Sequence, residues 1–140
     1  MKIGAHLSTS QGILKNFHKA QELGINCFQI FASSPRMWRV KGMDGSITLK
    51  FRHQLKVSGL NSSFIHIKYL VNLVSPDMDV QKKSILATIE ELNLGSELGL
   101  SGAMFHIGSH KQQDRISALK ILAKNIKLIL KESSPRLIYS

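Results

Sequence analysis

The chain is short of cysteine and of long apolar runs. Its 140 residues include a single cysteine, Cys27, so no disulfide can form within the chain, and the cytoplasm is the default compartment. No apolar run approaches the roughly 20 residues that span a bilayer, and the first residues lack the apolar core of a signal peptide. These absences exclude a disulfide scaffold and a membrane-spanning segment. Cys27 itself is predicted to be a small buried core residue.

Acidic residues are scarce beside basic ones. Lysine and arginine total 19 against 9 aspartate and glutamate residues, which gives a formal net charge of +10. Excess positive charge favours a polyanionic partner, with nucleic acid first. The alternative is that the charge serves solubility alone, because a high isoelectric point does not identify a partner.

A glycine-rich phosphate-binding loop is also missing, because Gly4, Gly12 and Gly24 are too widely spaced for either common motif. What is present is an alternation of strand and helix patterns. Strands are predicted over residues 2–7, 26–31, 64–66, 102–105 and 136–140, and helices over 10–23, 48–57, 76–98 and 112–132. The first of these helices is predicted to begin at a Ser10 N-cap.

This alternation predicts a parallel α/β sheet with right-handed crossovers. The missing phosphate loop favours a barrel over an open nucleotide-binding sheet. Four and a half βα units cannot close an eight-stranded barrel, which usually takes about 250 residues. Residues 1–140 are therefore predicted to form a single N-terminal portion of a (β/α)8 TIM barrel, a half-barrel.

The predicted helices have an apolar face and a charged face. In the helix over 76–98, Glu91 is predicted to lie on the solvent face with Lys82, Lys83 and Glu90. In the helix over 112–132, the residues predicted to face inward are Ile116, Leu119, Ala123, Ile126 and Ile129.

Three histidines are predicted at the carboxyl ends of strands, where the working residues of such barrels lie. They are His6, His66 and His106, on the first, third and fourth strands. Because neighbouring strands lie about 4.8 Å apart, the last two can meet on one ion about 2.0–2.1 Å from each nitrogen. A single strand-end histidine is more often structural, but a pair on adjacent strands favours a metal site. His66 and His106 are therefore the predicted metal ligands.

Four motifs occur in one order along the chain. They are GAHLS at 4–8, FASSPRMWR at 31–39, HIKYLVNLVSP at 66–76 and FHIGSH at 105–110. Together they resemble the endonuclease IV family of apurinic/apyrimidinic DNA endonucleases. The resemblance covers the whole chain but only about the first half of such an enzyme. It implies a TIM barrel with a cluster of three zinc ions, DNA repair as the process, and cleavage of double-stranded DNA 5′ to abasic sites by metal-assisted hydrolysis.

The resemblance also implies roles for individual residues. His66 and His106 match two of the zinc-binding histidines and are catalytic through the zinc. Tyr69 and Arg36 match positions that hold the abasic nucleotide flipped out of the duplex. Weaker candidates for DNA contact or scaffold are Ser8, Trp38, Arg39 and Asn72. Packing is the alternative role for Trp38 and Tyr69.

Some positions depart from the family's pattern. Gln11 replaces a glycine, Ile107 replaces a proline, and Ile67 with Lys68 replaces smaller residues. Lys68 is predicted to add a phosphate contact. None of the nine acidic residues is predicted at the carboxyl end of a strand, where the family's bridging carboxylate lies. We therefore expect at most one partial zinc site and little cleavage by these 140 residues alone.

Two other functions stay open. One is a non-catalytic DNA-binding half-barrel, and the other is a different TIM-barrel enzyme such as a sugar isomerase. Arg36, Trp38 and the charge of +10 argue against a small sugar, which needs no basic rim. A half-barrel would also expose sheet edges and an apolar inner face, so self-association is expected.

Overall fold

Five parallel strands form one sheet in sequence order, and helices connect them. The structure is a computed structural model that describes residues 1–60, 62–133 and 138–139. The strands are β1 (Gly4–Leu7), β2 (Cys27–Ile30), β3 (Phe64–His66), β4 (Gly102–Met104) and β5 (Ile138–Tyr139). The helices are α1 (Lys15–Glu22), α2 (Gly45–Val57), α3 (Met78–Leu98) and α4 (Arg115–Glu132). Every pairing is parallel, in the order β1-β2-β3-β4-β5.

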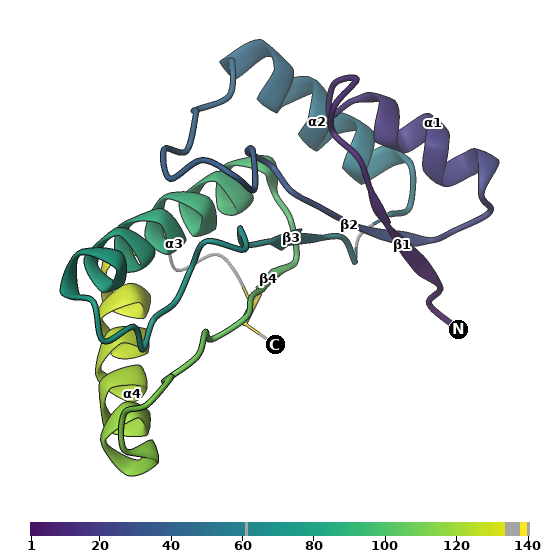
Figure 1. Cartoon of the computed structure of the whole chain (residues 1–140). Coiled ribbons are helices and arrows are strands. Elements are labelled where there is room, and N and C mark those ends of the chain that lie inside the picture. The colour runs from purple at the N-terminus through teal and green to yellow at the C-terminus, as the bar shows by residue number, and fades with distance from the viewer. Residues whose placement is uncertain (61, 134–137, 140) are drawn as a thin grey trace.

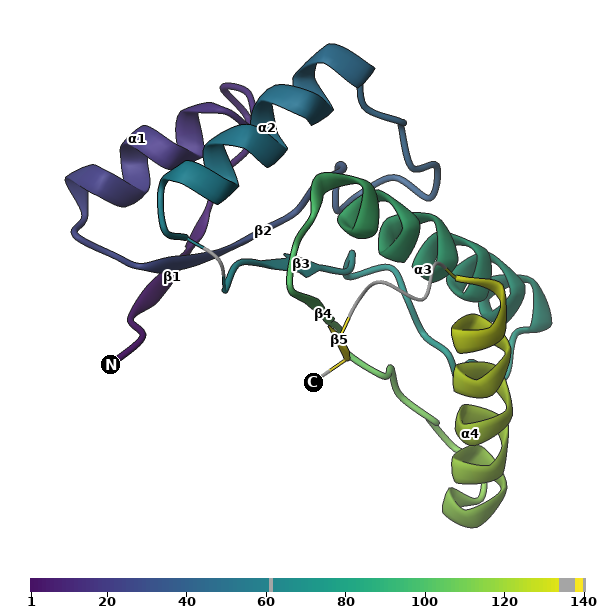
Figure 2. The same ribbon diagram turned by 180° about the vertical axis from the view of Figure 1, so that it is seen from behind.

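The helices lie on one side of a curved sheet. In two views related by a half-turn (Figures 1 and 2), α1 and α2 cover one end of the sheet, while α3 and α4 cover the other. Within the described residues, the opposite face of the strands carries no helix. This arrangement confirms the predicted half of a (β/α)8 barrel. Of the predicted fifth strand, residues 136, 137 and 140 lie outside the described residues.

Helices α2, α3 and α4 each have an aspartate as the N-cap residue. Asp44, Asp77 and Asp114 each accept hydrogen bonds from amides in the first turn, which would otherwise lack partners. Helix α1 differs, because it begins at Lys15 and its N-cap Leu14 makes no side-chain cap. The predicted cap at Ser10 is therefore wrong. Residues 9–12 form a turn closed by the bond from the Gly12 amide to the Thr9 carbonyl at 2.9 Å.

Alternation along the strands divides their side chains between the two faces of the sheet. Leu7, Phe28, Ile30, Ile65 and Ala103 are buried toward the helices. The alternating partners on the open face include His6, Cys27, Gln29, His66 and Met104. Cys27 is half-buried on that open face, so its predicted place in the core is wrong. A Cβ on Gly4 would lie only 2.6 Å from the Cys27 sulfur, which explains a glycine opposite it.

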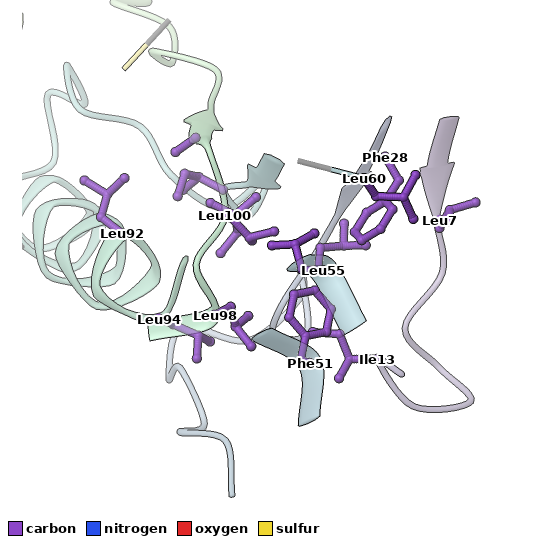
Figure 3. Packing of buried hydrophobic residues seen from close by; sticks show 14 of the residues in the cluster. Leu7, Ile13, Phe28, Phe51, Leu55, Leu60, Leu92, Leu94, Leu98 and Leu100 are labelled. Carbon is purple, nitrogen blue, oxygen red and sulfur yellow. The ribbon is translucent and has the colours of Figure 1, made fainter. Parts of the chain in front are cut away.

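The core fills the space between the sheet and the helices. Figure 3 shows Phe28 of β2 close to Phe51 and Leu55 of α2, with Leu94 and Leu98 of α3 alongside. The rings of Phe28 and Phe51 meet edge to face, with centroids 6.3 Å apart. Edge-to-face contacts of this kind add to the stabilisation from the apolar area that the rings bury.

The buried faces of α3 and α4 differ from those that the apolar pattern of the sequence predicts. Glu91 and Lys68 are almost fully buried, with 0% and 2% of their surfaces exposed, so the predicted solvent face for Glu91 and phosphate contact for Lys68 are wrong. Ile116 and Leu119 are exposed on α4, whose buried residues are Ala118, Asn125 and Ile129. The apolar pattern did not predict these buried faces correctly, because polar residues such as Lys68, Glu91 and Asn125 occupy part of the interior.

No helix in the described part of the chain is long and apolar enough to cross a membrane.

Candidate metal and DNA-binding site

Three imidazoles gather at the rim where the strands end. His66 is the last residue of β3, and His106 follows β4 by two residues. Their ring centroids lie 5.3 Å apart, and the ring of His6 lies 6.0 Å from that of His66. The parallel register pairs His66 with Met104, so the chain after β4 continues past the end of β3 and carries His106 to the same rim. The predicted convergence of His66 and His106 is thus present.

His66 is held in one orientation. Its Nδ1 donates a hydrogen bond to the Ile67 carbonyl at 2.6 Å, so Nδ1 carries a proton, and in the neutral ring the lone pair is on Nε2. A metal-binding histidine is commonly fixed in this way by a carbonyl partner. Two imidazoles that share one tetrahedral zinc at about 2.0–2.1 Å have ring centres roughly 5 Å apart. The donor type and the observed spacing of His66 and His106 therefore fit two of the four ligands of a zinc ion.

His6 is bonded differently. The Gln29 side-chain amide donates to His6 Nδ1 at 2.9 Å, across the pairing of β1 with β2. That bond occupies the lone pair of Nδ1, so the ring proton is on Nε2. His6 Nε2 is therefore a hydrogen-bond donor at the rim. Partial burial, and next the positive charge of a protonated His66, lower the pKa of His6. His6 therefore favours its neutral form beside the other two rings.

An aromatic ring links the histidines to Tyr69. Phe31 directly follows β2, and its centroid lies 4.5 Å from His6, 5.0 Å from His66 and 5.0 Å from Tyr69. Tyr69 remains 63% exposed, and its ring stacks toward His106 at 6.5 Å. The tyrosine therefore stands on the rim with one edge supported and much of its surface free.

The loops after β3 and β4 are tied together. The Asn72 side-chain amide donates to the Ser109 carbonyl at 3.0 Å, and its Oδ1 accepts from the Val74 amide at 3.2 Å. The Leu73 amide donates to the Ile107 carbonyl at 3.2 Å. These bonds fit the scaffold role of Asn72, since they place the loop that follows His106 against the loop that follows His66.

The loop between β2 and α2 carries the basic residues. Arg36 and Arg39 are exposed, and Trp38 is half-buried. Ser8 is exposed in the first loop, where its hydroxyl donates to Ser10 Oγ at 2.9 Å. The predicted DNA-side residues thus lie in three loops that follow the strands. Contact with DNA stays a prediction for each of them.

Within the described residues, no group of three or more histidine, cysteine, aspartate or glutamate side chains is placed to hold a metal ion. Glu91 is buried instead between two loops, where it accepts from Ser33 Oγ at 2.5 Å. Two histidines are fewer ligands than the four that a tetrahedral zinc ion takes, and zinc binding here stays a prediction.

Comparison with known proteins identifies the family. A family profile described as "Xylose isomerase-like TIM barrel" matches residues 17–136. The chain belongs to this family. Within it, the chain is similar to the "Probable endonuclease 4" of Aquifex aeolicus, at 35% identity over 95% of the chain and 47% of the relative. The corresponding protein of Petrotoga mobilis is also 35% identical, over 94% of the chain and 47% of its own length.

A solved structure agrees with these relatives. Endonuclease IV from Thermus thermophilus superposes with a TM-score of 0.86 at 27% identity, over 99% of this chain and 50% of the other. These matches confirm the resemblance to endonuclease IV. The chain spans about half the length of the curated relatives it matches.

Sequence reasoning missed several residues of this TIM-barrel rim. Phe31 begins one of the four motifs, and its place directly after β2 is the signal that puts it beside the histidines. Gln29 alternates with buried Phe28 and Ile30, which is a signal for the open face. The buried contact between Lys68 and Glu91 joins residues 23 positions apart, and only the fold shows it.

Proposed function

We propose that this chain is the N-terminal portion of a zinc-dependent endonuclease that repairs duplex DNA at abasic sites. The observation that carries the proposal is the meeting of His66 and His106 at one rim, 5.3 Å apart, beside an exposed Tyr69. The names of the relatives, which are endonucleases, support the same reaction class.

His66 and His106 are the residues that would hold zinc here, through His66 Nε2 and a nitrogen of His106. A bound zinc would supply a hydroxide nucleophile near neutral pH and neutralise charge on a phosphodiester. Hydrolysis 5′ to the abasic site is the proposed reaction. His6 adds a neutral hydrogen-bond donor at the same rim, because its Nδ1 already accepts from Gln29.

Tyr69 and Arg36 are the proposed DNA contacts. The exposed Tyr69 ring has a supported edge against Phe31, so it can fill the space that an extruded nucleotide leaves. Arg36 and Arg39 are exposed in the neighbouring loop and can pair with backbone phosphates. The net charge of +10 adds attraction that does not depend on DNA sequence.

Binding is the property to test, because we expect little cleavage from these residues alone. Fluorescence anisotropy would compare a duplex that carries one tetrahydrofuran abasic analogue with the same duplex undamaged, with zinc and with a chelator. The abasic duplex should bind more tightly. Tyr69→Ala should remove most of that preference, while Tyr69→Phe, which keeps the ring, should retain it.

Two further variants test separately how the charge of Arg36 and the zinc ligand His66 contribute to DNA binding. Arg36→Ala should weaken binding to the abasic duplex more than to the undamaged duplex and reduce the salt slope by about one. His66→Ala should remove the effect of zinc on DNA binding. The matched control is His53→Ala, at an exposed residue of α2, which should leave that effect intact. Equal affinity for the two duplexes, unchanged by Tyr69→Ala, would contradict the proposal. Zinc-dependent binding of simple sugars would instead favour a sugar isomerase.

A further inference from the structure

A buried ion pair joins two of the rim loops. Lys68, in the loop after β3, and Glu91, in α3, both have fully buried side chains, with Nζ and Oε1 3.7 Å apart. Fully buried lysine and glutamate are rare unless paired. An ion pair in the interior also gains little stability, because desolvation offsets the attraction, and apolar residues of similar volume often serve as well. Stability alone therefore does not account for these two residues.

The hydrogen bonds of Lys68 hold the loop that carries Arg36. Its Nζ donates to the Met37 carbonyl at 2.9 Å and to the Trp38 carbonyl at 3.4 Å. These carbonyls directly follow Arg36 in the chain. An apolar residue at position 68 would deprive both carbonyls of this donor and release the loop from its bonds to β3's end.

The bonds of Glu91 complete the connection. One carboxylate oxygen accepts from Ser33 Oγ at 2.5 Å, in the loop between β2 and α2. The other accepts from the Lys68 amide at 2.9 Å, directly before Tyr69. The carboxylate thus bonds one loop three residues before Arg36 and the other loop one residue before Tyr69.

We propose that Lys68 and Glu91 are positioning residues that fix the loop of Arg36 relative to the loop of Tyr69, so that both reach one abasic nucleotide. This inference rests on the proposed function. It predicts that the ion pair matters more for recognising the lesion than for stability or for general affinity toward DNA.

The test uses the whole chain and three variants: Lys68→Met, Glu91→Gln and the double variant Lys68→Met/Glu91→Leu. The exposed neighbours Lys83 and Glu90 provide the controls Lys83→Met and Glu90→Gln. Trp38 is the only tryptophan, so its emission and acrylamide quenching report on the loop without any DNA. Anisotropy with abasic and undamaged duplexes reports on recognition, and urea unfolding reports on stability.

Lys68→Met and Glu91→Gln should increase quenching of Trp38 and reduce the preference for the abasic duplex roughly tenfold. Affinity for the undamaged duplex should fall no more than in Lys83→Met, which removes the same charge. The double variant should recover part of the stability that the single variants lose, since it leaves no unpaired buried charge. It should not recover the preference, because the Met37 and Trp38 carbonyls still lack the Lys68 donor. A purely structural role would make stability and preference recover together, and that result would overturn the proposal.

Two further outcomes are decisive. Unchanged Trp38 quenching in both single variants would overturn the proposal, as would increased quenching with an intact preference for the lesion. If a single variant fails to fold, Ser33→Ala removes one hydrogen bond and should still speed amide exchange in residues 33–38 relative to α3. Wild-type protein that does not distinguish the two duplexes would refute the proposed function, while Trp38 quenching would still decide whether the pair holds the loop.

Discussion

Gly108 is the position where one added methyl group should disturb the rim most. Its φ is +97°, a backbone conformation that residues with a side chain rarely adopt. An ideal Cβ there would lie 2.1 Å from Asn72 Oδ1 and 2.7 Å from the Asn72 backbone Cα. Backbone strain of this kind costs on the order of 1–3 kcal/mol. The contact with backbone cannot be relieved by rotating a side chain, and overpacking adds about 1–3 kcal/mol.

Gly12 provides a matched control. Its φ is +99°, yet a Cβ there would meet nothing within 4 Å. Gly12→Ala should therefore show the strain alone, and Gly108→Ala should unfold more easily by a further ~1–3 kcal/mol. Urea unfolding followed by circular dichroism measures both. Gly108→Ala should also weaken zinc binding, because it displaces the loop after His106. Equal stabilities and equal zinc affinities for the two variants would refute this reasoning.

Three other perturbations test the core, the buried carboxyl and the open face. Phe51→Ala should destabilise the chain by about 3–5 kcal/mol in urea, because Phe51 is fully buried, whereas the exposed Leu49→Ala should change stability by less than about 0.5 kcal/mol. Burial raises the pKa of Glu91 above the usual 4.5, against the opposing effect of its hydrogen bonds. The protonated form of Glu91 is therefore favoured more in the folded chain than in the unfolded chain. The resulting stabilisation of the fold is present below about pH 4.5 and is lost as the pH rises through the folded pKa. Glu91→Gln should remove that loss, and urea midpoints across pH should then vary less than in wild type. Met104, 45% exposed on the open face, should contribute to self-association, so Met104→Lys should lower the mass that light scattering reports at high concentration; an unchanged mass would count against this face.

The sequence predicted the strand order and the strand-end histidines well because both follow from local patterns. Alternating strands and helices restrict the topology to a parallel sheet. In such a sheet the carboxyl ends of neighbouring strands share one rim, which was enough to bring His66 and His106 together. The aspartate caps of α2, α3 and α4 are local in the same sense, because each side chain accepts from amides two or three residues later.

The buried polar residues could not be predicted in the same way. Lys68 is in a loop and Glu91 is among charged residues of a helix, so each reads as exposed when considered alone. Lys68 bonds to the carbonyls of Met37 and Trp38, 31 and 30 positions earlier in the chain, and Glu91 accepts from Ser33, 58 positions earlier. On α4, Asn125 faces inward because its amide donates to the Leu73 carbonyl at 2.8 Å. Hydrogen bonds over such separations leave no periodic pattern in a sequence.

The most direct measurement of the central claim is a zinc titration of the chain followed by ¹⁵N NMR of its imidazole rings. We expect His66 Nε2 and one nitrogen of His106 to shift at the same zinc concentrations, while His66 Nδ1 keeps the proton that it donates to Ile67. His66→Ala or His106→Ala should each abolish the shift of the other ring, and the exposed His53 should not respond. Independent titration of the two rings, or no response from either, would contradict a shared zinc site at this rim.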